Sequence, residues 1–190
     1  MFRQPDARSC GASVLVTAAQ LAGSVRVADR AAFEVLVLTA HRRLTAVATR
    51  GRLQLPWPRA LGTPPWTLAR ELGALHGVRY RIRWVRTGAV VDQVAGHDLP
   101  VAVYIGSRWL PRHVVLALPD TYPADDRTDD QTGPPHDPTD PATPVYDPAV
   151  GALVTLARAR WQGPLRLAGW DQPWFALVPG AQAPSPASSA

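Results

Sequence analysis

The sequence predicts an α+β fold, in which three helices are followed by an antiparallel β-sheet that packs against them. Two observations carry this prediction. Up to residue 77, apolar side chains recur at intervals of three and four residues, as they do on the buried face of a helix. From residue 78 onward, apolar residues alternate with polar ones or form short runs, which is typical of β-strands.

Three segments with helical spacing each begin after a residue that commonly caps helices. Ser9, Asp29 and Thr63 occupy these N-cap positions, and the third helix has proline in its first turn. Gly23 and Gly77 are suited to end the first and third helices, because glycine readily adopts the left-handed conformation found there. The predicted helices span residues 10–22, 30–50 and 64–76.

The first predicted strand is "VRYRIRWVR" at residues 78–86, in which Arg79, Arg81 and Arg83 share one face. We expect this face to be solvated, and a surface for anions or nucleic acid is the alternative. A short helix is predicted at Val90–Val94. Further strands are predicted at residues 99–106, 113–119, 144–148, 152–157 and 174–179. Five tryptophans are expected to pack the sheet, with a place in a substrate cleft as the alternative for Trp109: Trp84, Trp109, Trp161, Trp170 and Trp174.

The length of 190 residues predicts one domain, over residues 1–179, followed by a disordered tail at residues 180–190. Residues 119–144 stand apart as an insertion, because they hold seven Asp, one Arg and seven Pro. That composition disfavours a helix or a central strand. The whole chain carries +5 and the insertion carries −6, so the remaining residues carry +11.

Composition also limits the functional classes. One cysteine excludes an internal disulfide and a cysteine-cluster metal site, and His136, Asp137 and Asp140 lie in the acidic segment without a ligand pattern. No run is apolar enough to cross a membrane, and no secretion signal opens the chain, so we expect a cytoplasmic protein without a membrane partner. Lysine and asparagine are absent, as in a chain coded by a GC-rich, actinobacterial-type genome. The arginine content is therefore weak evidence for nucleic acid, and we expect no nucleic-acid partner, no cofactor and no metal.

Cys10 is the first candidate for chemistry. It stands at the predicted start of a helix, where free N–H groups and the helix dipole favour a thiolate. A small apolar residue packing a helix end is the structural alternative. A histidine next to the thiol would make Cys10 a nucleophile.

His113 differs from the other four histidines because it opens the apolar strand "HVVLAL", a rigid element at the edge of the core. We expect His41 on the polar side of the second helix and His76 at the C-terminal end of the third. His97 lies in a predicted turn. A structural role at the strand edge is the alternative for His113.

Two further residues complete a possible constellation. The chain has no asparagine, so an imidazole would have to be oriented by Asp or Gln. Asp147, in "VYDPAVG", would lie beside His113 if the strands at residues 113–119 and 144–148 pair. An ordinary Asp-Pro turn is the alternative. Gln4 stands six residues before Cys10, where its amide could form an oxyanion hole with the Cys10 N–H group.

The motifs "Q-x5-C-G" at a helix start, then "RHVVLAL", then "YDPAVG", resemble the papain-like cysteine peptidases. They are most similar to the branch of peptidases that process bacteriocin leaders ending in a double glycine. The resemblance covers about residues 3–178. It implies a papain-like fold, with Cys10 as nucleophile, His113 as base and acid, Asp147 as orienter and Gln4 in the oxyanion hole.

The function predicted from these features is a thiol hydrolase that cleaves a peptide or protein substrate through an acyl-enzyme. A papain-fold deamidase or acyltransferase would use the same residues, because either water or an amine can accept the acyl group. A binding module without activity is the third alternative. We also expect residues 120–141 to form a mobile flap beside the active site, or else a solvated loop without a role. The sequence does not predict an oligomeric state.

Overall fold

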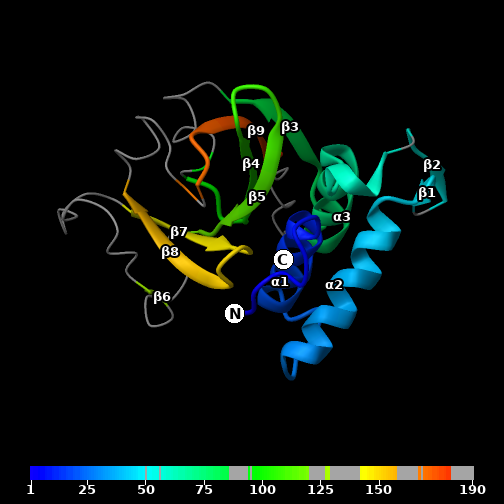
Figure 1. Ribbon diagram of the computed structural model, residues 1–190, viewed down its shortest axis with the longest axis horizontal. Coiled ribbons are helices and arrows are strands. Elements are labelled where there is room, and N and C mark those ends of the chain that lie inside the picture. Colours follow the sequence, from blue (N-terminus) through cyan, green and yellow to red (C-terminus); the bar gives the residue numbers. More distant parts are fainter. Residues whose placement is uncertain are drawn as a thin grey trace, which may run out of the picture.

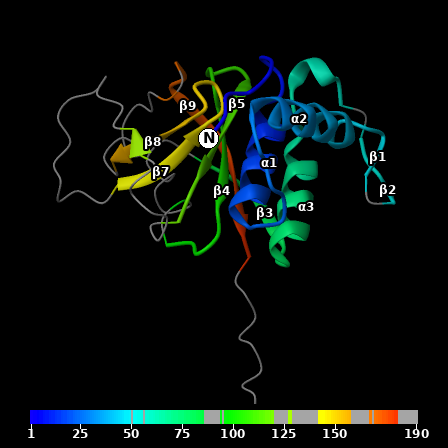
Figure 2. The same cartoon turned by 90° about the horizontal axis from the view of Figure 1, so that it is seen from below.

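In the computed structural model, three helices lie together on one side of a β-sheet (Figures 1 and 2). The helices are α1 (Cys10–Leu21), α2 (Arg30–Leu44) and α3 (Pro65–His76), with a short 3-10 helix at Arg59–Leu61. The predicted α+β class is therefore confirmed. The structure describes residues 1–49, 51–55, 57–85, 94, 96–119, 127–128, 142–157, 167 and 169–180.

The helix starts follow the sequence signals in part. The Asp29 side chain caps α2 as predicted, accepting a hydrogen bond from the Ala32 N–H group at 2.8 Å. Ser9 occupies the N-cap of α1, but its hydroxyl donates to the Asp6 carbonyl at 3.2 Å instead of accepting from the helix. The prediction for Thr63 is wrong, because α3 begins at Pro65 with Pro64 at its N-cap.

The second helix is shorter than predicted. Its last turn is closed by Thr45, whose hydroxyl donates to the His41 carbonyl at 2.8 Å. After this turn the chain forms a small hairpin of β1 (Ala48–Thr49) and β2 (Arg52–Leu53). The helical spacing of apolar residues therefore continues past the point where Thr45 ends the helix.

The main sheet has seven strands in the order β3-β9-β4-β5-β7-β8-β6. The C-terminal strand β9 inserts between β3 and β4, so β3 forms one edge. All neighbours pair antiparallel except β6 and β8, which pair in parallel. The strands are β3 (Tyr80–Trp84), β4 (Val101–Gly106), β5 (Pro111–Ala117), β6 (Arg127–Thr128), β7 (Ala142–Asp147), β8 (Ala152–Ala157) and β9 (Gln172–Pro179).

Both faces of the sheet's centre are buried. Toward the helices, residues such as Leu116 of β5 pack with Val14 of α1 and Phe33 of α2. On the opposite face, Val103 and Val115 belong to a second apolar cluster. Two-sided burial explains why β4 reads as a continuous apolar run in the sequence, without the alternation of a half-exposed strand.

The tryptophans divide between core and surface. Trp170 and Trp174 are half-buried and pack against the two clusters, as predicted. The same prediction is wrong for Trp84 and Trp109, which are 76% and 70% exposed. Trp84 stands on the edge strand β3, and Trp109 lies in the turn between β4 and β5 with the Arg108 guanidinium 4.4 Å from its ring centroid.

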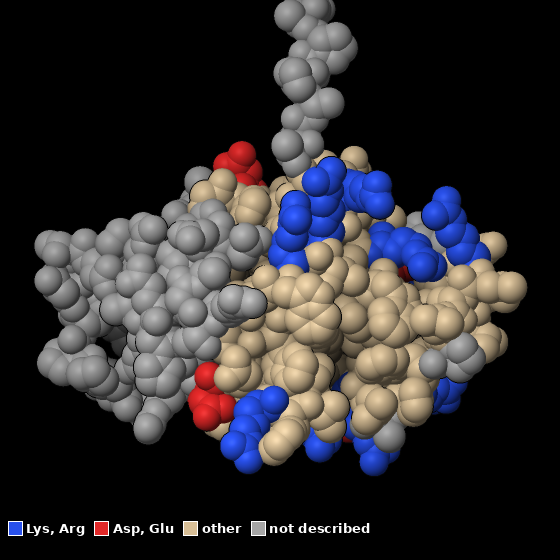
Figure 3. Space-filling model, turned by 90° about the horizontal axis from the view of Figure 1, so that it is seen from above, with Lys and Arg blue, Asp and Glu red and all other residues tan. Residues whose placement is uncertain are grey.

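The arginines at positions 79, 81 and 83 are exposed, as predicted for the polar face of β3. On the face of the molecule in Figure 3, basic side chains lie around the rim of a mostly uncharged centre. None of the helices in the described part of the chain is long and apolar enough to span a bilayer.

Several predictions fall outside the described residues. They concern the short helix at Val90–Val94, of which Val94 alone is described, and the flap at residues 120–141, of which Arg127 and Thr128 alone are described. They also concern Trp161, His136 and the tail from residue 181 onward.

Candidate active site

Cys10 is the first residue of α1, and its side chain is 4% exposed. The following residue, Gly11, lets the start of this helix approach the segment before α3 closely. A Cβ atom at Gly11 would lie 2.6 Å from the Cβ atom of Thr63, which is too close for two carbon atoms. The Thr63 carbonyl is in turn fixed by a hydrogen bond from the Tyr104 hydroxyl at 2.9 Å. The Cys-Gly pair therefore places the thiol at a tightly packed helix N-terminus, where N–H groups favour a negative charge.

His113 and Asp147 come together because β5 and β7 are neighbours in the sheet. The His113 Nε2 atom and the Asp147 Oδ1 atom lie 2.8 Å apart, and the two residues are 5% and 2% exposed. The same carboxylate oxygen accepts a hydrogen bond from the Ala149 N–H group at 2.8 Å. Asp147 therefore both holds the imidazole and stabilises the turn after β7. The sequence offered these two roles as alternatives, and in the structure one carboxylate makes both contacts.

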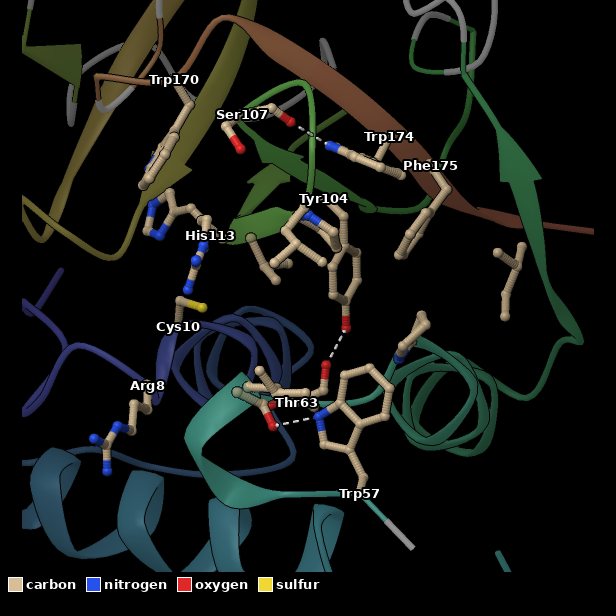
Figure 4. A pocket seen from close by; sticks show the side chains of 18 of the residues that line it. Arg8, Cys10, Trp57, Thr63, Tyr104, Ser107, His113, Trp170, Trp174 and Phe175 are labelled. Atoms are coloured by element: carbon tan, nitrogen blue, oxygen red, sulfur yellow. Dashed lines mark hydrogen bonds between the residues drawn. The ribbon is translucent and has the colours of Figure 1, made fainter. Parts of the chain in front are cut away.

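His113 also interacts with Cys10. Burial alone would lower the pKa of the His113 imidazole, but hydrogen bonds to Asp147 and Cys10, together with their charges, raise its pKa to about 9. Since Nε2 is used by Asp147, Nδ1 is the ring nitrogen left for the thiol. Figure 4 shows Cys10 and His113 facing each other at one end of a pocket. This arrangement favours an imidazolium at neutral pH.

The segment before α1 is tied to the end of β7. The Gln4 N–H group donates to the Pro148 carbonyl at 2.8 Å, and the Tyr146 hydroxyl donates to the Phe2 carbonyl at 2.7 Å. Gly151 leaves room for this segment, because a Cβ atom there would lie 2.3 Å from the backbone nitrogen of Arg3. The N-terminal residues therefore lie beside the turn that carries Asp147.

The Gln4 backbone makes a hydrogen bond, but its side-chain oxygen makes none within the described residues. Its Oε1 atom is buried and has no hydrogen-bond partner among the described residues. Gln4 is also absent from the residues that line the cavity described next. The structure thus brings Cys10, His113 and Asp147 into one cluster, and it brings the backbone of Gln4 to the edge of that cluster.

A cavity of about 1000 Å³ opens beside Cys10 and His113. Its walls are largely aromatic. Two of the ring N–H groups are satisfied by the protein backbone: those of Trp57 and Trp174 donate to the carbonyls of Gly62 and Ser107 at 3.0 and 2.9 Å. The cavity therefore offers apolar ring surfaces to a ligand. The aromatic lining residues are Trp57, Trp66, Trp84, Tyr104, Trp170, Trp174 and Phe175.

Sequence reasoning missed the part of this cavity that comes from the connection before α3. The segment "QLPWPRALGTPPW" was interpretable only as a proline-broken link, yet it supplies Trp57, Leu61 and Trp66. The available signal was the presence of two tryptophans among prolines. Tryptophan side chains on a rigid, irregular segment are more typical of the wall of a binding site than of a linker.

Two other histidines lie away from the cluster. His41 was expected on the polar side of α2 but is buried, and burial lowers its pKa. His76 stands in the last turn of α3, as predicted, and its pKa is also lowered by burial. Neither lines the cavity beside Cys10. Among the described residues, no three His, Cys, Asp or Glu side chains gather as metal ligands would.

No family model matches the chain, and no curated protein matches it. Among solved structures, the chain is similar to the crystal structure of the peptidase domain of Streptococcus ComA, described as a bi-functional ABC transporter involved in a quorum-sensing pathway. The two sequences are 15% identical, and the similarity covers 94% of this chain and 97% of that chain with a TM-score of 0.48.

Proposed function

We propose that this protein is a papain-like cysteine peptidase, a thiol hydrolase that cleaves a peptide or amide bond through an acyl-enzyme. One observation carries the proposal. A buried imidazole, bonded to Asp147 at 2.8 Å and raised in pKa to about 9 by Asp147 and Cys10, adjoins a thiol at a helix N-terminus. Groups that hold such a charge inside a protein are typical of active sites.

In the proposed first step, the Cys10 thiolate attacks the carbonyl carbon of the scissile bond. The C–S bond forms while the carbonyl electron pair moves to oxygen, and the Cys10 N–H group with the Gln4 amide would stabilise that oxyanion. The C–N bond then breaks, and the His113 imidazolium gives its proton to the leaving nitrogen. Asp147 keeps the ring oriented and balances its charge.

In the second step, water attacks the thioester carbonyl, and the now neutral His113 accepts a proton from that water. The C–S bond breaks as the carbonyl re-forms, which releases the carboxylic acid and restores the thiolate and the imidazolium. If an amine replaced water, the same site would transfer the acyl group. Product masses from a model peptide, with and without an added amine, distinguish hydrolysis from transfer.

Iodoacetamide labelling of Cys10 across pH tests the proposal directly. We expect wild type to be alkylated faster than free cysteine at neutral pH, because a neighbouring imidazolium favours the reactive thiolate. The variant His113→Ala should lose this reactivity, whereas His97→Ala should retain it, because His97 lies in a connecting segment and does not line the cavity. Labelling of wild type that follows the titration of a free thiol, unchanged by His113→Ala, would refute the proposed function.

A further inference from the structure

A second groove lies next to the aromatic cavity. It has a volume of about 780 Å³, and four arginines line it: Arg52 of β2, Arg70 of α3, Arg79 just before β3, and Arg81 of β3. Trp66 and Ile82 line both the groove and the cavity beside Cys10. A single extended ligand could therefore occupy both.

The groove carries positive charge that the described protein does not neutralise. None of its lining residues is acidic, and its four guanidinium groups form no ion pair within the described residues. The Arg70 Nη1 atom is buried and has no hydrogen-bond partner there. A buried N–H group of a charged side chain that lacks an acceptor is costly, which adds to the unneutralised positive charge beside the groove.

We propose that this groove binds the carboxylates of an acidic segment of the peptide whose scissile bond lies beside Cys10. The proposal rests on the proposed function, since it assigns the same peptide to both sites. Guanidinium groups match carboxylates well, because their N–H groups form a planar fork that donates two parallel hydrogen bonds. The substrate class is thus a peptide with an apolar part for the cavity and an acidic part for the groove.

The groove suits an acidic peptide better than a nucleic acid. Binding of single strands depends on exposed aromatic faces on which bases stack. Among the described residues, two aromatic ones line the groove: Tyr80 is buried with its hydroxyl bonded to the Pro100 carbonyl, so the half-buried Trp66, which packs edge-to-face with Trp57, is the one ring left for stacking. The wall that the groove shares with the cavity beside Cys10 also favours a peptide, because one peptide could then occupy both.

Fluorescence anisotropy of the full chain tests the proposal without relying on catalysis. The probe is a fluorescein-labelled peptide with an apolar segment followed by a run of Asp and Glu, and its control has Asn and Gln in that run. Both are titrated onto Cys10→Ala, so that cleavage cannot consume them. The groove variant is Arg81→Glu, and the matched control is Arg83→Glu, which makes the same charge change on the same exposed face of β3 without lining the groove.

We expect the acidic probe to bind more tightly than its amide control, and the difference to shrink as salt is raised. Arg81→Glu should weaken binding of the acidic probe about tenfold, and Arg83→Glu by about twofold or less. Equal affinities for the acidic and amide peptides would overturn the proposal. So would tighter binding of a single-stranded oligonucleotide that also depends on Arg81.

Iodoacetamide labelling separates the two proposals. If Cys10 reacts as an activated thiol but acidic peptides are not preferred, the groove proposal fails and the peptidase proposal stands. If acidic peptides bind as expected while Cys10 behaves as a free thiol, the groove is a binding site on a protein that is not a thiol hydrolase.

Discussion

At the scale of single residues, Asp147 shows how one side chain combines stability with the proposed chemistry. Its Oδ1 atom accepts the Ala149 N–H group and also contacts the His113 ring, each at 2.8 Å. An asparagine amide could also orient an imidazole, but the chain contains no asparagine, and a carboxylate occupies this position. The carboxylate adds a negative charge that an amide would lack, and this charge helps to hold His113 protonated.

The variant Asp147→Asn separates the two roles. It retains an oxygen that can accept the Ala149 N–H group, so the turn after β7 should persist, while the loss of the buried charge beside His113 should lower the melting temperature. Because an amide oxygen can still accept from the ring, the loss of the negative charge is the main change, and it should lower kcat/KM by about 10²-fold. Thermal unfolding and turnover of a model peptide check this together. Undiminished turnover would show that the charge of Asp147 does not contribute to the chemistry.

The pH dependence of kcat/KM follows from the raised pKa of His113. In the proposed mechanism the imidazolium donates the proton to the leaving group, and this form is present below its pKa of about 9. Activity should therefore fall as pH rises through about 9. In Asp147→Asn the residual activity should fall at lower pH, because the neighbouring negative charge that raises the pKa is gone. An alkaline limb at the same pH in both proteins would contradict the assignment of this limb to His113.

Gly11 offers a test of how the thiol is positioned. In Gly11→Ala, the new methyl group would meet the Thr63 Cβ atom at 2.6 Å, so the start of α1 or the segment before α3 must move. We expect a loss of about 1–3 kcal/mol in the free energy of unfolding and slower labelling of Cys10. Chemical denaturation and iodoacetamide kinetics measure the two effects. Wild-type values for both would show that this contact does not position the thiol.

At the scale of elements, local sequence signals predicted where helices and strands form. They predicted less well what surrounds each element in the fold. Asp29 caps α2 as its sequence suggests, because its partner lies three residues away. Thr63 does not cap α3: the helix begins at Pro65, and Thr63 instead packs against Gly11 and accepts a bond from Tyr104, 41 residues away. Alternation correctly placed Trp84 on a strand. It could not reveal that this strand is an edge, which depends on β9 inserting between β3 and β4.

The candidate site likewise has a part that local sequence signals predicted and a part that they did not. Cys10, His113 and Asp147 could be selected from the sequence because each stands at or near the end of an element: Cys10 begins α1, Asp147 ends β7, and His113 is the third residue of β5, which begins earlier than the predicted strand. The aromatic cavity could not be predicted. Its walls come from α3, from β3, β4 and β9, and from an irregular connection, and only long-range packing assembles them.

Trp84 and Trp109 form a matched pair for testing the cavity. Both are largely exposed, but only Trp84 lines the cavity, where it meets the Phe175 ring edge-on at 5.7 Å between centroids. Trp84→Ala should cost at most about 1 kcal/mol of stability and raise KM for a peptide with bulky apolar side chains several-fold. Trp109→Ala should change neither. If both substitutions had the same effect on KM, the cavity would not be the peptide site.

At the scale of the whole molecule, the helices and the sheet contribute different parts of the candidate site. The helical layer provides the thiol at the start of α1, and the sheet provides His113 and Asp147 from neighbouring strands. The N-terminal segment joins the two, through hydrogen bonds from Gln4 to Pro148 and from Tyr146 to Phe2. Any rearrangement that separates helices from sheet should therefore abolish activity before it unfolds either part.

The central claim is that Cys10 forms a covalent acyl-enzyme. Intact-protein mass spectrometry after rapid mixing with an activated ester of an N-acetylated apolar dipeptide measures this most directly. We predict a mass increase of one acyl group, located on Cys10 by peptide mapping, which decays as product appears and is absent from Cys10→Ala. Turnover of the ester without an adduct on Cys10, or with the same rate in Cys10→Ala, would contradict the account.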